Sequence, residues 1–277
     1  MNTNSDFIIE ESILVEYTGK EQIVKIPDTV TYIGAYAFRG CDMITAVEIP
    51  DSVTEIMLEA FRDCTNLTSV KFPNSVTSIW KGAFWGCENL KSIEIPKCVT
   101  CIEDFSFWGC SSLASVKLPD NITHIGEKAF YDCTSLTSIE IPDSVKTICK
   151  GAFAHCSHLA TIELPSNLKF IDDQAFYHCK SLKSIVIPSG VKTIGEYAFG
   201  NCTNLSSINI PDSVTEIGNY AFEDSTGLIS VEIPKNVKKI GFGAFQGCTG
   251  LKTIKIPEGC ILGNRWNNLC KAEIIFY

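Results

Sequence analysis

Basic residues are scarce in this sequence of 277 residues. Lysine and arginine together number 23, against 32 aspartate and glutamate residues, and the net charge is −9. Because an acidic surface repels phosphate groups and no basic cluster offsets that average, the composition argues against a nucleic-acid partner. Long apolar runs are also absent: no stretch approaches the roughly 18 residues that a transmembrane helix needs. We therefore expect no membrane insertion.

The beginning of the chain lacks the marks of a secretory leader. It reads MNTNSDFIIEESILVEYTG, with no basic segment, no long apolar stretch and no small-residue cleavage site. Such a start is not typical of a signal peptide. We expect either a cytoplasmic protein or, as the alternative, a cell-surface or secreted protein whose leader was removed beforehand.

Sequence signatures of catalysis are missing too. The sequence has no GxSxG motif, no P-loop, no HExxH motif and no GxGxxG in a strand–helix context. Acidic residues are spread along the chain at regular intervals and are not paired as acid–base catalysts are. We expect no catalytic residues, no cofactor and no enzymatic activity.

What the sequence does contain is a repeat of 23 residues, which its prolines make visible. The eleven prolines stand at intervals of 23, and none lies outside the series. A fixed period of this length is the signature of a repeat architecture. Phenylalanine follows the same period, at Phe38, Phe61, Phe84, Phe107, Phe130, Phe153, Phe176, Phe199, Phe222 and Phe245. Cysteine does so at Cys41, Cys64, Cys87, Cys110, Cys133, Cys156, Cys179, Cys202 and Cys248, with Ser225 in the gap.

The consensus unit, L-x-S-I-x-I-P-x-x-V-x-x-I-G-x-x-A-F-x-x-C-x-x, has a physical interpretation. I-x-I alternates apolar and polar residues like a half-buried strand, and proline ends it because proline has no N–H to donate. A-F-x-x-C has the spacing of one turn of 3₁₀ or α-helix. One coil cannot bury these apolar residues alone, so we expect one stacked array with a parallel sheet at about 4.8 Å spacing.

A column of charges supports this stacking. The outward residue of I-x-I alternates in sign over the first six coils, at Lys25, Glu48, Lys71, Glu94, Lys117 and Glu140. Opposite charges on neighbouring strands attract modestly, whereas like charges destabilise the pair. This charge ladder therefore indicates solubility and register, and it marks the sheet as one candidate contact surface.

The repeat resembles the BspA-like leucine-rich repeats, named for a bacterial surface antigen, over about residues 24–256. The resemblance implies an α/β leucine-rich-repeat solenoid: a right-handed superhelix with a concave parallel β-sheet and short helical or 3₁₀ turns on the other side. It also implies adhesion or host-protein binding, and it carries over no catalytic residues. We expect an N-terminal hairpin-like cap (1–23), ten tandem repeats (24–256) and a C-terminal cap (257–277), in which Trp266 and Leu269 replace Ala-Phe.

Two residue types raise the possibility of metal or redox chemistry. The nine repeat cysteines share one inward position, which predicts a buried, reduced ladder and no unique disulfide pairing. Cys98-Val-Thr-Cys101 is a CxxC motif without a second CxxC to complete a zinc site. His155 and His178 occupy one column of neighbouring coils and would need a third ligand, so we expect two exposed histidines and no metal site.

Aromatic residues offer a second candidate surface. Trp80, Trp85, Phe105, Trp108 and Tyr131 fall near one edge of the third to fifth coils. Contiguous exposed aromatic residues mark binding surfaces, but these rings can equally pack on one another and only stiffen the coils. We expect a monomeric, non-catalytic protein–protein interaction module. The alternative is a carbohydrate-binding surface along this aromatic edge.

Overall fold

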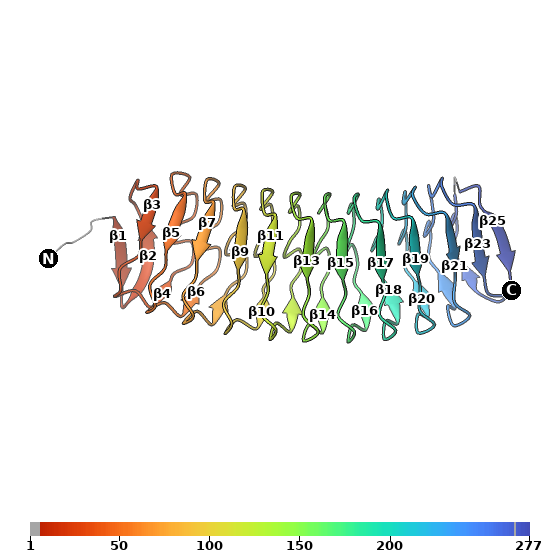
Figure 1. Ribbon diagram of the computed structural model, residues 1–277, viewed down its shortest axis with the longest axis horizontal. Helices are drawn as coiled ribbons and strands as arrows, with labels where there is room; N and C mark the ends of the chain where they lie inside the picture. Colours follow the sequence, from red (N-terminus) through yellow and green to blue (C-terminus); the bar gives the residue numbers. More distant parts are fainter. Residues whose placement is uncertain (1–5, 269) are drawn as a thin grey trace.

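The computed structural model describes residues 6–268 and 270–277, and it is a rod of stacked coils (Figure 1). Its described residues form about eleven turns of a β-solenoid and contain strands, turns and bends but no helix. No helix within the described ranges has the length and apolar character needed to cross a membrane. Each coil has three sides: a long strand, a short strand and an irregular turn.

The first side carries the I-x-I segment of each repeat as a strand. Many successive strands pair in parallel with a step of 23 residues, in sheets of two or three strands, so that Val47 lies between Val24 and Val70. In most of these strands the central residue is buried and its two neighbours are exposed, as the alternation predicts. The long strands are β3 (Ile23–Lys25), β5 (Ala46–Glu48), β7 (Ser69–Lys71), β9 (Ser92–Glu94), β11 (Ser115–Lys117), β13 (Ser138–Glu140), β15 (Thr161–Glu163), β17 (Ser184–Val186), β19 (Ser207–Asn209), β21 (Ser230–Glu232) and β23 (Thr253–Ile256).

The second side carries the V-x-x-I segment, whose last two residues form a short strand. Most of these strands also pair in parallel with their neighbours, and their second residue is a buried Ile, such as Ile102 or Ile125, in all but the last strand, which has the half-buried Leu262. They are β4 (Tyr32–Ile33), β6 (Glu55–Ile56), β8 (Ser78–Ile79), β10 (Cys101–Ile102), β12 (His124–Ile125), β14 (Thr147–Ile148), β16 (Phe170–Ile171), β18 (Thr193–Ile194), β20 (Glu216–Ile217), β22 (Lys239–Ile240) and β24 (Ile261–Leu262).

The third side corrects the prediction of helical turns. In the first coil Tyr36 and Gly40, which flank Ala37 and Phe38, have left-handed φ angles of 62° and 70°. A right-handed helix excludes such angles. The amide of Ala37 bonds locally to Gly34 O, but the amide of Phe38 donates to Ala60 O of the next coil, 2.8 Å away. Every second amide on this side thus donates to a carbonyl oxygen of the next coil, because stacking supplies acceptors that a single helical turn lacks.

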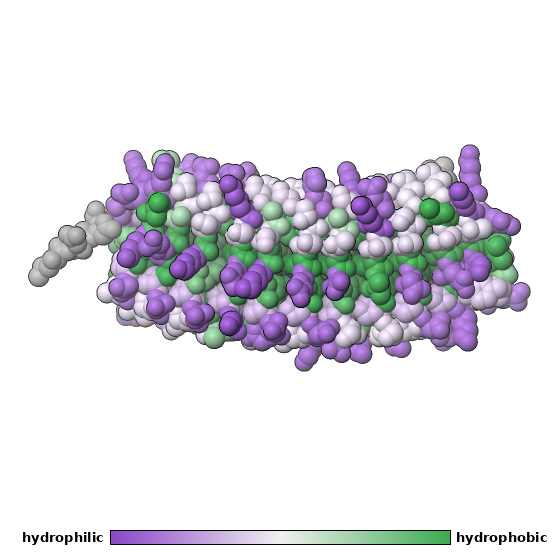
Figure 2. All heavy atoms as spheres, viewed as in Figure 1, coloured by the Kyte–Doolittle hydropathy of each residue, from purple (hydrophilic) through white to green (hydrophobic). Residues whose placement is uncertain are grey.

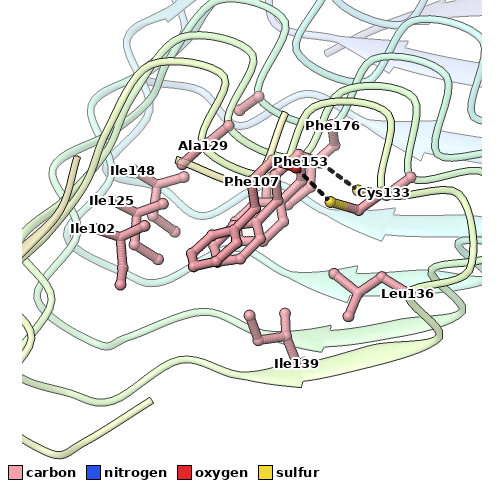
Figure 3. Packing of buried hydrophobic residues seen from close by; sticks show 14 of the residues in the cluster. Ile102, Phe107, Ile125, Ala129, Cys133, Leu136, Ile139, Ile148, Phe153 and Phe176 are labelled. Atoms are coloured by element: carbon pink, nitrogen blue, oxygen red, sulfur yellow. Dashed lines mark hydrogen bonds between the residues drawn. The ribbon is translucent and has the colours of Figure 1, made fainter. Parts of the chain in front are cut away.

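The phenylalanine column forms the centre of the core. All ten repeat phenylalanines are fully buried, and neighbouring rings stack with centroids from 4.8 Å (Phe38 and Phe61) to 5.8 Å (Phe153 and Phe176) apart. Figure 3 shows the rings between the isoleucines of the short strands and the leucine that leads into each long strand. Each ring is therefore covered on both faces only by its neighbours, and a single coil would leave them exposed.

The cysteine column is reduced, and it has a polar role as well as a packing role. The thiol of Cys133 donates a hydrogen bond to the carbonyl oxygen of Phe107 in the preceding coil, at 3.2 Å (Figure 3). Ser225 makes the equivalent bond to Phe199 O at 2.7 Å. All described cysteines are free thiols. Serine can therefore replace cysteine in this column because both supply a donor at the same place.

Both ends depart from the repeat. At the N-terminal end β1 (Phe7–Glu10) and β2 (Ile13–Tyr17) form an antiparallel hairpin, and β2 continues the short-strand sheet by pairing with β4. At the other end β25 (Glu273–Phe276) pairs in parallel with β23, and the Trp266 ring lies edge-on to Phe245 at 6.4 Å. Leu269, the other residue expected to replace Ala-Phe, lies outside the described residues.

Candidate binding surfaces

The charge ladder lies on the long-strand side, with neighbouring members on hydrogen-bonded or adjacent strands. Lys117 Nζ is 2.6 Å from Glu94 Oε1, and farther along the ladder Lys255 Nζ is 3.0 Å from Glu232 Oε2. The hydrogen bond from Lys117 lowers the pKa of Glu94. These side chains are largely exposed, so solvent screens each pair and it stabilises the stack only weakly. The ladder is therefore a solvated surface that a partner can contact.

An apolar band runs beside the charge ladder. Figure 2 looks onto the long-strand side and shows this band along most of the rod, bordered by polar rows. The band consists of inward-facing residues of the long strands, such as Val116, Ile139 and Ile162, which are almost fully buried and keep only 5–9% of their surface exposed. One border is a row of small hydroxyl residues such as Ser138 and the other is the charge ladder. We name this surface, with its two borders, the long-strand face.

The charge of the long-strand face changes along its length. After Glu140 the alternation ends, and Glu163 lies directly beside Glu140 in the parallel pair of β13 and β15. Asp120 and Asp143 join these two carboxylates around a shallow hollow of about 390 Å³. The next coil presents Val186, whose side chain is 75% exposed. The long-strand face therefore has an acidic stretch followed by an uncharged, apolar one.

Four of the five predicted aromatic residues lie together on the turn side. The rings of Trp85 and Trp108 stack at 4.8 Å, and Phe105 contacts both at 5.8 and 5.4 Å. Tyr131 continues the row at 5.1 Å from Trp108. The guanidinium of Arg62 covers the other face of Trp85, 3.9 Å from the ring centroid. These rings are half-buried and use their faces on one another, so they present mainly edges to solvent.

Trp80 lies apart from the other four. It follows β8 on the short-strand side, is 49% exposed, and its Nε1 donates a hydrogen bond to Glu55 Oε2 at 3.1 Å. Its ring borders a shallow hollow that Cys101 and Glu103 also line. No ring contact joins Trp80 to the other four anywhere in the described part of the chain. The five residues thus form one row of four and a separate tryptophan.

The aromatic row is longer than the sequence predicted. Tyr131 contacts His155 at 4.9 Å, and His155 stacks on His178 at 4.7 Å and 11°. Tyr197 and Tyr220 stack farther along at 4.8 Å. His155 and His178 belong to one further column of the repeat, and Tyr197 and Tyr220 to another, so following the column of Trp85, Trp108 and Tyr131 could not reveal them. The signal that was available is the excess of Tyr and His in the columns on either side.

The expectation of two exposed histidines is therefore wrong. His155 and His178 are half-buried in the aromatic row, and burial is the main cause that lowers the pKa of both imidazoles. Within the described ranges no group of three or more His, Cys, Asp or Glu side chains is arranged to hold a metal ion. The pair is a packing element whose neutral form the row favours.

Comparison with known proteins identifies the class to which this geometry belongs. The sequence profile described as "BspA type Leucine rich repeat region (6 copies)" matches residues 15–133, 77–180 and 169–268. The chain belongs to this family of leucine-rich-repeat proteins. Proteins of this kind are generally non-enzymatic scaffolds. No curated protein matches the chain.

Solved structures support the same assignment. A leucine-rich repeat protein from Bacteroides ovatus is 30% identical, with a TM-score of 0.76 over 98% of this chain and 71% of the other. A leucine-rich cell surface protein from Faecalibacterium prausnitzii is 26% identical, with a TM-score of 0.50 over 96% of each chain. The pneumococcal vaccine antigen PcpA, at 19% identity and a TM-score of 0.60 over 98% of this chain and 85% of its own, shares the fold.

Proposed function

We propose that this protein is a non-catalytic protein–protein interaction module whose contact surface is the long-strand face. The observation that carries the proposal is the apolar band between a hydroxyl row and a charged row, continuous over neighbouring coils. Protein interfaces combine an apolar centre with a polar rim. The partner is a protein segment or domain long enough to lie across several coils.

The positions of the charges make the two ends of this surface chemically different. The acidic stretch at Glu140 and Glu163 lies next to the apolar stretch at Val186, so the two ends of a bound partner meet different chemistry. Charges at the rim set orientation and association rate more than affinity. A partner with a basic end followed by an apolar end fits this order.

Adhesion or host-protein binding is the biological setting that we propose for this contact. It is supported by the likeness to a protein described as a leucine-rich cell surface protein, at 26% identity. In this proposal the protein acts as a monomer.

A second candidate function is carbohydrate binding along the aromatic row. Trp85, Phe105, Trp108 and Tyr131 form a contiguous, half-exposed surface of the size of a short oligosaccharide. Their ring faces are engaged with one another and with Arg62, so a sugar would contact ring edges unless the stack opened. This geometry makes the aromatic row the weaker of the two candidates.

The deciding experiment compares three variants in affinity capture from host and source-cell extracts. The face variant is Glu140→Arg/Glu163→Arg, and its control, with the same change of charge off the long-strand face, is Glu88→Arg/Glu196→Arg. The third variant is Trp85→Ala/Trp108→Ala. A protein retained by wild type and control but lost by the face variant supports the proposal. Loss only in the tryptophan variant, or a glycan-array signal that depends on it, supports the second candidate instead.

A further inference from the structure

One column of the short-strand side changes its chemistry halfway along the rod. The residue after the buried V of V-x-x-I is threonine in the first five coils and mostly lysine in the next five. All ten residues precede a short strand and are exposed or partly exposed. The column runs Thr31, Thr54, Thr77, Thr100, Thr123, Lys146, Lys169, Lys192, Thr215 and Lys238.

Threonine suits this column because its hydroxyl joins neighbouring coils. Thr77 Oγ1 donates to Thr54 O at 3.2 Å, and Thr123 Oγ1 donates to Thr100 O at 3.2 Å. Even among the lysines, Thr215 Oγ1 donates to Lys192 O at 3.2 Å. A lysine ammonium is too far from the backbone to repeat this bond. Stability of the stack therefore does not explain why lysine replaces threonine.

Three of these lysines, Lys146, Lys169 and Lys192, stand on consecutive coils, whereas Thr215 separates Lys238 from them. The amide of Lys192 donates to Lys169 O at 2.7 Å, so their backbones are neighbours at a coil spacing of about 4.8 Å. Like charges on adjacent strands destabilise a sheet. None of the ion pairs found in the described residues includes Lys146, Lys169, Lys192 or Lys238. We name these four residues the lysine row.

The contrast with other lysines shows that pairing is available in this fold. Lys239, next to Lys238, is 2.7 Å from Glu216, and on the long-strand side Lys117 pairs with Glu94. In a protein of net charge −9, four unpaired ammonium groups in line form a local positive strip.

We propose that the lysine row binds a linear acidic polysaccharide lying along the solenoid axis. Such a chain carries anionic groups at regular intervals along its length, and the coils of the solenoid repeat at about 4.8 Å along its axis. Phe170, 38% exposed and directly after Lys169, offers an apolar contact for a ring face, and the hydroxyls of Thr147 and Thr193 flank it. This surface is separate from the long-strand face, so the proposal does not depend on the function proposed above.

Other polyanions fit less well. In an extended acidic peptide, side chains on one face recur every second residue, about 6.7 Å apart, which is out of step with a row of about 4.8 Å. Single-stranded nucleic acid is held by stacking its bases on several aromatic rings. Among the residues next to the lysine row in sequence, Phe170 is the one aromatic residue.

The test uses a substitution that the fold already accepts. Lys146→Thr/Lys169→Thr/Lys192→Thr restores the residue of the first five coils, and Lys25→Thr/Lys71→Thr/Lys117→Thr removes the same charge from the long-strand side. Binding is measured by titration calorimetry at low and physiological salt, with polygalacturonate and heparin as acidic polysaccharides, and with dextran, poly-L-glutamate and oligo-dT for comparison. Circular dichroism and thermal unfolding establish that both variants keep the fold.

We expect wild type and control to bind an acidic polysaccharide, and the row variant to bind it about tenfold more weakly or worse, with a smaller salt dependence. Equal weakening in both variants, or no binding of either polysaccharide by wild type, overturns the proposal. Stronger binding of poly-L-glutamate or oligo-dT through the same lysines overturns the assignment to a polysaccharide. Binding of dextran at equal strength overturns the role of charge.

Discussion

The thiol of Cys133 donates to the carbonyl oxygen of Phe107 at 3.2 Å, and that oxygen also accepts the amide of Cys110. One carbonyl thus joins its own coil to the next. The same arrangement recurs along the column, with Ser225 in the place of one cysteine. Cysteine here is both a filler of the core and a donor between coils.

This dual role predicts different effects of two substitutions at Cys133. Cys133→Ala removes the donor and leaves a small cavity, so it should lower the free energy of unfolding by about 1–3 kcal/mol. Cys133→Ser keeps the donor, as Ser225 does, and should cost clearly less. Urea unfolding followed by circular dichroism measures both. Equal losses in the two variants would show that the thiol acts only by filling space.

The cysteine column also predicts loss of stability in alkaline solution. Burial raises the pKa of Cys202 to about 12 and raises the pKa of the other buried thiols as well. In the unfolded chain thiols ionise near pH 8.5, so above that pH the unfolded state releases protons that the folded state retains. The free energy of unfolding should therefore fall from about pH 8.5 upward, toward the raised pKa values of the folded state.

Urea titrations between pH 7 and 10.5 test this alkaline loss. A variant with serine at several buried column positions, such as Cys110, Cys133 and Cys156, is the control, since serine does not ionise in this range. A wild-type profile as flat as that of the serine variant contradicts the prediction. Native alkylation at pH 8 should also modify the exposed Cys98 well before any buried thiol.

The stacked histidines predict the opposite pH dependence in acid. Burial lowers the pKa of His155 and His178 below the value near 6.5 of an unfolded chain. Below about pH 6.5 the unfolded state therefore binds protons that the folded state does not, and stability falls as the pH drops through this range. His155→Asn/His178→Asn should flatten the profile between pH 5 and 7.

Asparagine is the suitable replacement because both histidines have left-handed φ angles, 64° and 61°, and Asn201 has 58° at the same column. The comparison is the difference in free energy of unfolding between pH 7 and pH 5, in wild type and in the double variant. Identical differences would mean that these imidazoles contribute nothing to the acid response.

The aromatic row predicts a stability difference between two tryptophans. Trp85→Ala removes a ring held between Arg62 and Trp108 and should lower the free energy of unfolding by about 2 kcal/mol. Trp80→Ala removes an exposed ring with one hydrogen bond and should change it by less than about 0.5 kcal/mol. Thermal unfolding of the two variants side by side makes the comparison. Equal losses of stability in the two variants would show that the aromatic row does not stabilise the fold.

Sequence periodicity predicted the strands well because one rule, alternation ended by proline, governs each of them. Ile93 is buried and Glu94 exposed as expected. The helical turn was predicted wrongly because the spacing of Ala, Phe and Cys matches one helical turn, whereas the backbone takes a left-handed φ just before the Ala and again just before the Cys. The position before the repeat Cys holds only Gly, Asp, Asn or His, residue types that favour a left-handed backbone, so this part of the signal was available in the sequence. The position before the repeat Ala also holds Tyr, Phe and Lys, which give no such signal.

The candidate surfaces were predicted only where they follow a single column. Trp85 and Trp108 share a column, and their stacking could be anticipated. The contact between Tyr131 and His155 joins different columns, and it depends on how two turns are offset in space. The lysine row was invisible as a basic cluster because its members are 23 residues apart in sequence and adjacent only after the chain has coiled.

In the first half of the rod the outward charge of the long strand changes sign from each coil to the next, at Lys25, Glu48, Lys71, Glu94, Lys117 and Glu140. Loss or duplication of one 23-residue unit there leaves every backbone bond between coils available, yet it brings two like charges together at the junction. A change of two units restores the alternation. Gene rearrangements that shorten or lengthen this half of the protein should therefore be tolerated best in steps of 46 residues, so the molecule can vary its reach in double coils.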